Sequence, residues 1–135
     1  MPNGFLSNED MKKIVENGDM QLVVQKAKDA AKHIAEKLKV SSNQLRNIFN
    51  AIKKIQLKVN SGKIINLQRQ LLILIPKLYY ISKRTNGKLE KLKNDIEGMV
   101  ELIDNNKDKF NNFYSYIEAL LAYHRAFEKD KKKGE

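Results

Sequence analysis

Residues 41–62 read SSNQLRNIFNAIKKIQLKVNSG, and this stretch decides the fold class. Ser41 and Gln44 have the spacing of a capping box, in which each side chain accepts a hydrogen bond from the other residue's backbone N–H at the start of a helix. The apolar residues that follow recur every three or four positions as far as Ser61-Gly62, where a helix is expected to stop. They are Leu45, Ile48, Phe49, Ile52, Ile55 and Val59. This pattern predicts an amphipathic helix whose apolar side must pack on other helices.

Four more stretches show the same helical period on either side of this one. They cover residues 19–39, with Asp19 as the N-cap, and residues 64–86, 89–103 and 110–127. The 64–86 stretch is apolar nearly all round because Leu72 and Ile73 lie off its stripe, so we expect this helix at the centre of the fold. Pro76 lies inside it and removes a backbone hydrogen bond, which predicts a kink or a break. No segment alternates with period two, and the sequence therefore predicts an all-α, single-domain bundle of about five helices.

The two ends of the chain differ in composition from the predicted bundle. Residues 1–18 contain Pro2, Gly4 and Gly18 and only a short apolar set, so we expect a flexible arm with at most one marginal helix, ordered on a partner if at all. Residues 129–135 are almost wholly charged, which predicts a solvated tail. The helical bundle domain is therefore expected to occupy residues 19–128.

The composition limits the partners and the setting of the protein. The chain has 135 residues and no cysteine, which excludes disulfides and thiolate metal sites and fits a cytoplasmic location. Its longest apolar run, residues 71–75, is far shorter than the roughly 20 residues that cross a bilayer, so no membrane role is expected. Lys and Arg number 26 against 16 acidic residues, giving a net charge of +10. Such a charge attracts polyanions such as nucleic acid, although small proteins are also basic for reasons of solubility alone.

Residues suited to catalysis or metal binding are few. The two histidines, His33 and His124, belong to no metal-binding or triad motif, and His124 lies within an apolar stripe, where a satisfied, semi-buried imidazole is expected. Glu97 and Glu101 share a helical face, but Lys93 precedes Glu97 by four residues, which is typical of a solvated ion-pair face. The glycines form no phosphate-binding loop. We therefore predict no catalytic residue, no metal ion and no cofactor.

Basic residues occur beside the apolar stripes of three predicted helices. The candidate RNA-binding residues are Arg46, Lys53, Lys54, Lys77, Lys83, Arg84 and Arg125. Lys77 and Arg84 are seven apart on one side of their helix, Lys83 is on the other side, and Tyr79 and Tyr80 lie between them in sequence. Cations on rigid helices can follow an RNA backbone without reading its sequence, and a phenol adds a contact to a sugar or a base. The same positions are also the usual polar boundary of a core helix.

Three blocks of the sequence together resemble one known family. They are LRNIFNAI at 45–52, PKLYYISKR at 76–84 and FYSYIEALLAYHR at 113–125. In order and spacing they are similar to the small subunit of the type III-A (Csm) CRISPR effector complex, and the likeness extends over about residues 40–130.

The resemblance implies a five-helix, non-catalytic subunit that lines the groove holding guide RNA and target RNA, beside the other subunits of the complex. It also implies self-association as stacked copies. Apart from the resemblance, an exchange of helices between chains at the Gly62 or Gly87 connections is a route to a dimer. By this likeness the basic residues placed near RNA phosphates are Arg46, Lys53, Lys54, Lys77, Arg84 and Arg125. Lys83 is a departure from the family pattern, which commonly has a glycine before the arginine at this point.

Two other functions remain open from the residues. In the first, the protein is a basic helical adaptor or dimerisation module with no nucleic-acid role, and Leu72, Ile73 and Tyr80 form its protein interface. In the second, more distant one, the protein is a small nuclease that uses Glu97 with a metal ion. Sedimentation with and without RNA separates the first from an RNA-binding subunit, and metal-dependent cleavage tests the second.

Overall fold

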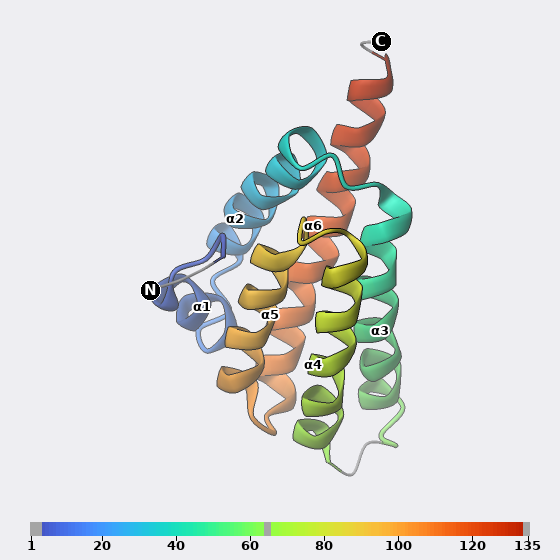
Figure 1. The fold of residues 1–135 in the computed structure, drawn as a ribbon. Helices are drawn as coiled ribbons and strands as arrows, with labels where there is room; N and C mark the ends of the chain where they lie inside the picture. The colour runs from blue at the N-terminus through green and yellow to red at the C-terminus, as the bar shows by residue number, and fades with distance from the viewer. Residues whose placement is uncertain (1–3, 64–65, 134–135) are drawn as a thin grey trace.

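The structure is a computed structural model that describes residues 4–63 and 66–133, with the backbone alone for residues 130–133. All the regular structure in these ranges is helical (Figure 1). The helices are α1 (Asn8–Val15), α2 (Met20–Lys32), η1 (His33–Lys37), α3 (Ser42–Asn60), α4 (Leu67–Arg84), α5 (Glu90–Ile103) and α6 (Lys107–Lys133). η1 is a π-helical turn that continues α2. The all-α prediction is confirmed, but the described residues form six α-helices where about five were expected.

The additional helix is α1, in the segment where the sequence predicted at most a marginal helix. Ser7 Oγ accepts a hydrogen bond of 3.0 Å from the backbone N–H of Asp10, and the Asp10 carboxylate accepts one of 3.1 Å from the N–H of Ser7. Met11, Ile14 and Val15 are buried in the same core as the rest of the bundle. Eight residues are too few for a stable isolated helix, so this burial against α5 and α6 holds α1 in place.

The predicted helix starts are confirmed at two positions. The Asp19 side chain accepts a hydrogen bond of 3.1 Å from the backbone N–H of Leu22 at the start of α2. At α3, Ser41 Oγ accepts from the Gln44 N–H and Gln44 Oε1 accepts from the Ser41 N–H, each at 3.2 Å, which is the predicted capping box. α3 then ends before Gly62, whose φ of 72° suits a residue without a Cβ.

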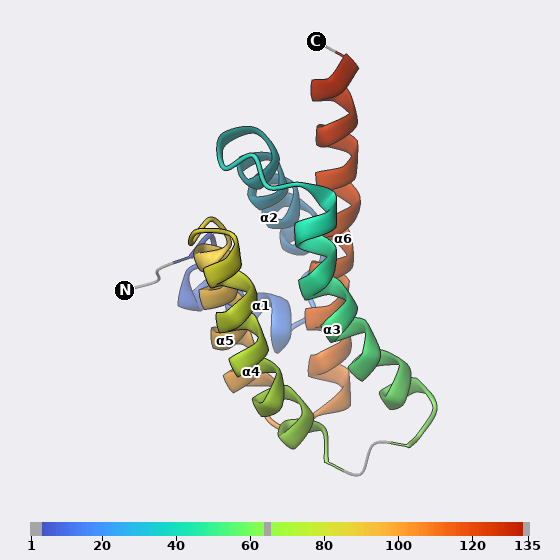
Figure 2. The ribbon, with the colours of Figure 1, turned by 45° about the vertical axis from the view of Figure 1, so that its right-hand side comes forward.

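The centre of the bundle is α6. It packs on α1, α2, η1, α3 and α5, and its Phe110, Phe113 and Tyr116 side chains are fully buried. Figure 2 shows α6 behind α3, and in Figures 1 and 2 its C-terminal end extends past the other helices. Because one long helix touches most of the others, α6 organises the shared core.

The prediction that residues 64–86 form the central helix is wrong. α4 packs on α3 and α5 at the edge of the bundle (Figure 2). Leu72 and Ile73, the two residues that made this segment look apolar all round, are 56% and 46% exposed. The excess of apolar residues therefore lies on the outer surface of α4 and does not make this helix the core.

Three details of the helix boundaries also differ from the sequence prediction. α4 runs from Leu67 to Arg84 through Pro76, so the predicted break is absent; Pro76 and Leu72 both face solvent, where water can satisfy the carbonyl that the proline leaves without a donor. The predicted start at Ile64 lies outside the described residues. α6 continues to Lys133, beyond the predicted end at residue 127.

Candidate nucleic-acid interface

Charge is distributed very unevenly along the chain. Residues 37–89 contain twelve of the 26 Lys and Arg residues and none of the 16 acidic residues. This segment therefore carries a formal charge of +12, and the rest of the chain −2. It comprises α3, α4 and the loops around them. The whole excess of positive charge thus belongs to the segment that holds two neighbouring helices, α3 and α4, and eight of its twelve cations lie on those helices.

A groove runs between α3 and α4, and we call it the α3/α4 groove. It consists of two adjoining hollows of about 550 and 340 Å³, which share Asn47, Tyr80 and Ile81 in their walls. The first hollow is also lined by Lys54 and Lys77, and the second by Arg84. The remaining residues of the walls are Gln44, Asn50, Ala51, Pro76 and Thr85. Neither hollow has an acidic residue among the described residues that line it.

Three of the seven predicted RNA-binding residues are therefore brought together. Lys54 comes from α3, and Lys77 and Arg84 come from α4, two turns apart on the side that faces α3. All three side chains are exposed, as a contact with phosphate requires. The predicted division of α4, with Lys77 and Arg84 on one flank and Lys83 on the other, agrees with their different surroundings.

Lys83 faces the opposite side of α4. It lines a separate hollow of about 310 Å³ between α4 and α5, together with Tyr79, Glu90 and Lys93. Lys93 is 6% exposed there, its Nζ lies 3.8 Å from the centre of the Tyr79 ring, and it is 4.0 Å from Glu90 Oε1. The expectation that Lys93 lies on a solvated ion-pair face is thus wrong, because the Tyr79 ring covers it.

Arg46, Lys53 and Arg125 lie on a third face, formed by α3 and α6. The Nζ of Lys53 is 6.0 Å from the centre of the Phe49 ring, which in turn lies 6.0 Å from the ring of Tyr114 on α6. Nearer the start of α3, the backbone N–H of Ser42 donates a 2.9 Å hydrogen bond to Glu128 of α6. Arg46 lies between these two contacts on α3, and Arg125 lies between them on α6. The seven predicted residues thus occupy three faces of the molecule.

Two neighbouring tyrosines of α4 differ in their surroundings. Tyr79 turns toward α5, where its hydroxyl donates a 3.4 Å hydrogen bond to Glu97 and its ring covers Lys93. Tyr80 lines both hollows of the α3/α4 groove and is 65% exposed, the most of the exposed large hydrophobic residues. The guanidinium carbon of Arg84 lies 5.8 Å from the centre of the Tyr80 ring. Tyr80 therefore presents an aromatic face beside a cation.

Comparison with known proteins identifies the family. The model of the family described as Csm2 Type III-A matches residues 17–130. The chain belongs to the Csm2 Type III-A family. The match runs from just before α2 into α6 and so includes both walls of the α3/α4 groove, whereas α1 lies outside it. No curated protein and no solved structure matches the chain.

Membership of the Csm2 family supports the predicted identity as a small subunit of the type III-A complex.

The two histidines, the residues best suited to chemistry, pack against other parts of the bundle. His124 is fully buried on α6, which is more than the predicted semi-buried position. Its Nε2 lies 2.8 Å from the carbonyl oxygen of Val40, but its Nδ1 is buried with no hydrogen-bond partner among the described residues, so the predicted satisfied imidazole is confirmed at one ring nitrogen and not at the other. His33 is half-buried, and its ring meets the edge of Phe5. Within residues 4–63 and 66–133, no group of three His, Cys, Asp or Glu residues is arranged to hold a metal ion.

Two features of this Csm2-family surface escaped the sequence prediction. One is the amide lining of the groove: Asn47 and Asn50 individually look like ordinary polar positions of a helix, and Gln44 was predicted only as the partner of Ser41 in the capping box. The other is the acid-free segment 37–89, which a running count of charge along the chain detects without a structure. The running count locates the positive charge in the segment that forms α3 and α4, whereas the total charge of +10 gives no location on the molecule.

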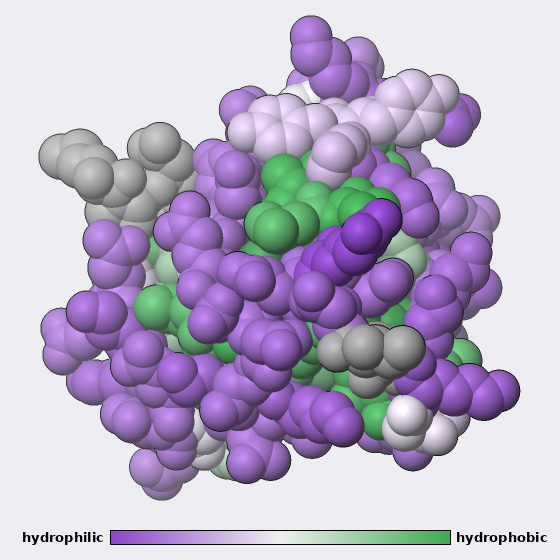
Figure 3. All heavy atoms as spheres, turned by 90° about the horizontal axis from the view of Figure 1, so that it is seen from below, coloured by the Kyte–Doolittle hydropathy of each residue, from purple (hydrophilic) through white to green (hydrophobic). Residues whose placement is uncertain are grey.

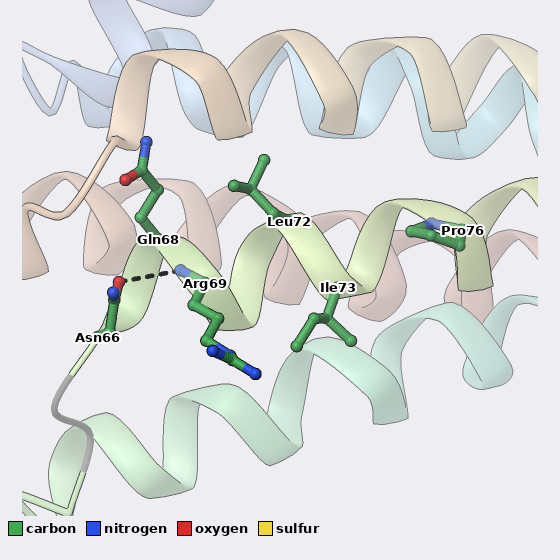
Figure 4. A pocket seen from close by; sticks show the side chains of 6 residues that line it. All are labelled: Asn66, Gln68, Arg69, Leu72, Ile73 and Pro76. Atoms are coloured by element: carbon green, nitrogen blue, oxygen red, sulfur yellow. Dashed lines mark hydrogen bonds between the residues drawn. The ribbon is translucent and has the colours of Figure 1, made fainter.

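The outer surface of α4 also carries an apolar hollow of about 560 Å³. Figure 4 shows Leu72 directed toward α5 and Ile73 toward α3, with Arg69 beside Ile73. Seen from below, the molecule has a hydrophobic patch at the surface with hydrophilic residues around it (Figure 3). None of the helices in the part of the chain that the structure describes is both long and apolar enough to span a bilayer.

Proposed function

We propose that the protein is a non-catalytic small subunit of a type III-A CRISPR effector complex, and that its α3/α4 groove holds the backbone of guide RNA or target RNA. The observation that carries this proposal is the placement of Lys54, Lys77 and Arg84 around one groove in the acid-free segment 37–89. Family membership supports the assignment to the type III-A complex, and the positive charge of the groove supports this surface as the RNA-binding one.

The arrangement suits contacts that do not depend on RNA sequence. Lysine and arginine bind phosphate oxygens, release counterions and so give affinity, but they read no base. Because Lys54, Lys77 and Arg84 project from two helices packed on each other, the spacing of their backbone positions is set before RNA arrives. No acidic side chain that lines the groove among the described residues opposes the approach of a phosphate.

Assembly into several stacked copies is the second part of the proposal. Leu72 and Ile73 leave an apolar surface on α4 that a neighbouring protein can cover, and this surface adjoins the α3/α4 groove through the shared residue Pro76. The same residues support the second candidate function, a helical adaptor or dimerisation module with no role in RNA binding. Sedimentation across protein concentration, with and without RNA, separates the two: a stable dimer indifferent to RNA favours the adaptor.

The experiment that tests RNA binding is a titration of RNA in rising salt. Replacing Lys54, Lys77 and Arg84 together with Ala should reduce the slope of log affinity against log salt by about 0.7 to 0.9 for each phosphate that the protein no longer neutralises. The matched control replaces Lys12, Lys28 and Lys107, three exposed lysines of α1, α2 and α6, and so removes the same charge elsewhere. Equal reductions of the slope in the two triple variants would contradict the groove as the RNA site.

A further inference from the structure

Tyr80 has an arrangement that backbone binding does not need. Its ring stands 65% exposed in the α3/α4 groove, whereas Tyr79 next to it is engaged with Lys93 and Glu97 of α5. The contact with Arg84 at 5.8 Å keeps a cation beside the Tyr80 ring. Single exposed apolar side chains are common, but this ring lines two adjoining hollows, so a ligand that enters the groove would cover it and gain the burial of its apolar surface.

The polar residues around Tyr80 are amides rather than carboxylates. Gln44 and Asn47 line the smaller hollow, and Asn47 and Asn50 line the larger one. A side-chain amide carries both donors and an acceptor, so it can pair with the edge of any nucleobase. Lys54 and Lys77 stand at the larger hollow, where they can hold phosphates of the same strand. An aromatic face, amides and cations in one groove are the combination with which proteins bind unpaired nucleotides.

We infer that the α3/α4 groove takes up an unpaired nucleobase, which stacks on Tyr80 while its neighbouring phosphates contact Lys54, Lys77 and Arg84. The inference rests on the proposed RNA binding and names the part of the RNA that enters the groove. A paired base cannot reach Tyr80, because in an A-form duplex both of its faces are covered by neighbouring bases. The groove therefore selects single-stranded or interrupted RNA over a continuous duplex.

The test compares two single strands of equal length and charge, an RNA and the same ribose-phosphate strand without bases. Binding is measured by fluorescence anisotropy of labelled strands with the full chain. We expect the unmodified protein to bind the RNA about 5- to 150-fold more tightly than the abasic strand, the range for stacking of one base. Tyr80→Ala should remove most of this ratio, and Tyr80→Phe should keep it. Tyr79→Ala is the matched control, because Tyr79 faces α5, and it should keep the ratio as well.

A second readout reports stacking directly. The chain has no tryptophan, so Tyr80→Trp introduces a single indole. Its fluorescence should be quenched by the RNA and not by the abasic strand, whereas the indole of Tyr79→Trp should respond to neither. Circular dichroism of each variant checks that the exposed substitutions leave the helices intact.

The outcomes separate this inference from the proposed function. Equal affinity for the two strands, with the salt dependence intact, would overturn the base site and leave backbone binding in place. Absence of binding to either strand would overturn both. A Tyr80→Ala variant that binds RNA normally but no longer self-associates in sedimentation would assign the groove to a protein partner instead.

Discussion

The Asp95 carboxylate on α5 accepts a hydrogen bond of 2.9 Å from the backbone N–H of Phe5, which lies 90 residues earlier in the chain. Its other oxygen accepts one of 3.2 Å from the N–H of Leu6. Gly4 makes this approach possible, since a Cβ at that position would overlap the Asp95 carboxylate. The segment before α1 is thereby tied to the core through a side chain that has no exposed surface.

This relationship predicts an unusual pH dependence. Burial raises the pKa of Asp95 from 3.8 to about 6, although the Phe5 and Leu6 N–H groups oppose the shift; the Asp10 carboxylate adds to it and Lys91 lowers it. The folded chain therefore holds a proton on Asp95 that the unfolded chain releases, so ionisation of Asp95 lowers stability as the pH rises through 6. We expect the free energy of unfolding to fall by about 2 kcal/mol from this group between about pH 4.5 and 7.5.

Denaturant unfolding across that range, with Asp95→Asn beside the unmodified protein, measures the effect. The difference in stability between the two should shift with pH in favour of the variant as the pH rises. Glu101→Gln, which changes an exposed carboxylate on the same helix, serves as the control and should give a nearly constant difference. A constant difference for Asp95→Asn would show that the carboxyl group titrates alike in the folded and unfolded chain.

Gly4→Ala should release the segment before α1. The added Cβ meets the Asp95 carboxylate and comes within 2.7 Å of the carbonyl oxygen of Lys91, so the segment must move away from α5. Since α1 is too short to persist alone, its amides should become at least about tenfold less protected from hydrogen exchange while those of α6 keep their protection. Asn8→Ala, at an exposed position in the same region, is the control and should leave the exchange of α1 much closer to that of the unmodified chain.

Local signals in the sequence predicted the helices well and their packing poorly. The caps at Asp19 and Ser41 depend on residues three positions away, and such short-range pairs can be read from the chain. α1 also has such a pair, Ser7 and Asp10, but at eight residues it depends in addition on the tie between Phe5 and Asp95 and on burial against α5 and α6, which no local pattern encodes. The prediction that residues 64–86 form the central helix is wrong because periodicity counts apolar residues but does not say which of them are exposed to solvent.

For the candidate RNA site, too, the sequence predicted the placement of residues on one helix but not which residues of different helices come together. Helical geometry alone separated Lys83 from Lys77 and Arg84, because residues seven apart share a side of a helix. It did not bring Lys54 to the same groove as Lys77, since that requires the packing of α3 on α4. Nor did it distinguish Tyr80 from Tyr79. Tyr79 contacts Lys93 of α5, whereas Tyr80 contacts Arg84 of its own helix and lines the groove beside α3.

Tyr116 should limit the stability of the core. Its ring is fully buried on α6, and its hydroxyl has no hydrogen-bond partner among the described residues. Burial, with the Asp95 carboxylate as the next cause, raises the pKa of this hydroxyl. Because an unsatisfied buried hydroxyl forgoes its hydrogen bonds to water, we expect Tyr116→Phe to raise the free energy of unfolding by about 1 kcal/mol. Urea unfolding measures the change, with the half-buried Tyr123→Phe as the control; a destabilised Tyr116→Phe variant would indicate a bonded hydroxyl.

The face formed by α3 and α6 should contribute less to RNA binding than the α3/α4 groove. It carries Arg46, Lys53 and Arg125, the same number of predicted cations as the groove, but acidic residues accompany them. Burial and, second, the Glu118 carboxylate raise the pKa of Tyr114, so Glu118 is close enough to this face to act on its groups. A phosphate arriving on this side meets partly offset charge, whereas the groove carries no such opposition among its described lining residues.

Replacing Arg46, Lys53 and Arg125 together with Ala should therefore change the salt slope of RNA binding by less than the replacement of Lys54, Lys77 and Arg84. Glu118→Gln gives an independent measure, because removing that carboxylate raises RNA affinity only if RNA passes near it. We expect Glu118→Gln to change the affinity by less than about twofold, on the scale of exposed charges at a distance. A larger gain in affinity, together with an equal reduction of the slope in the two triple variants, would move the RNA path from the groove to the α3 and α6 face.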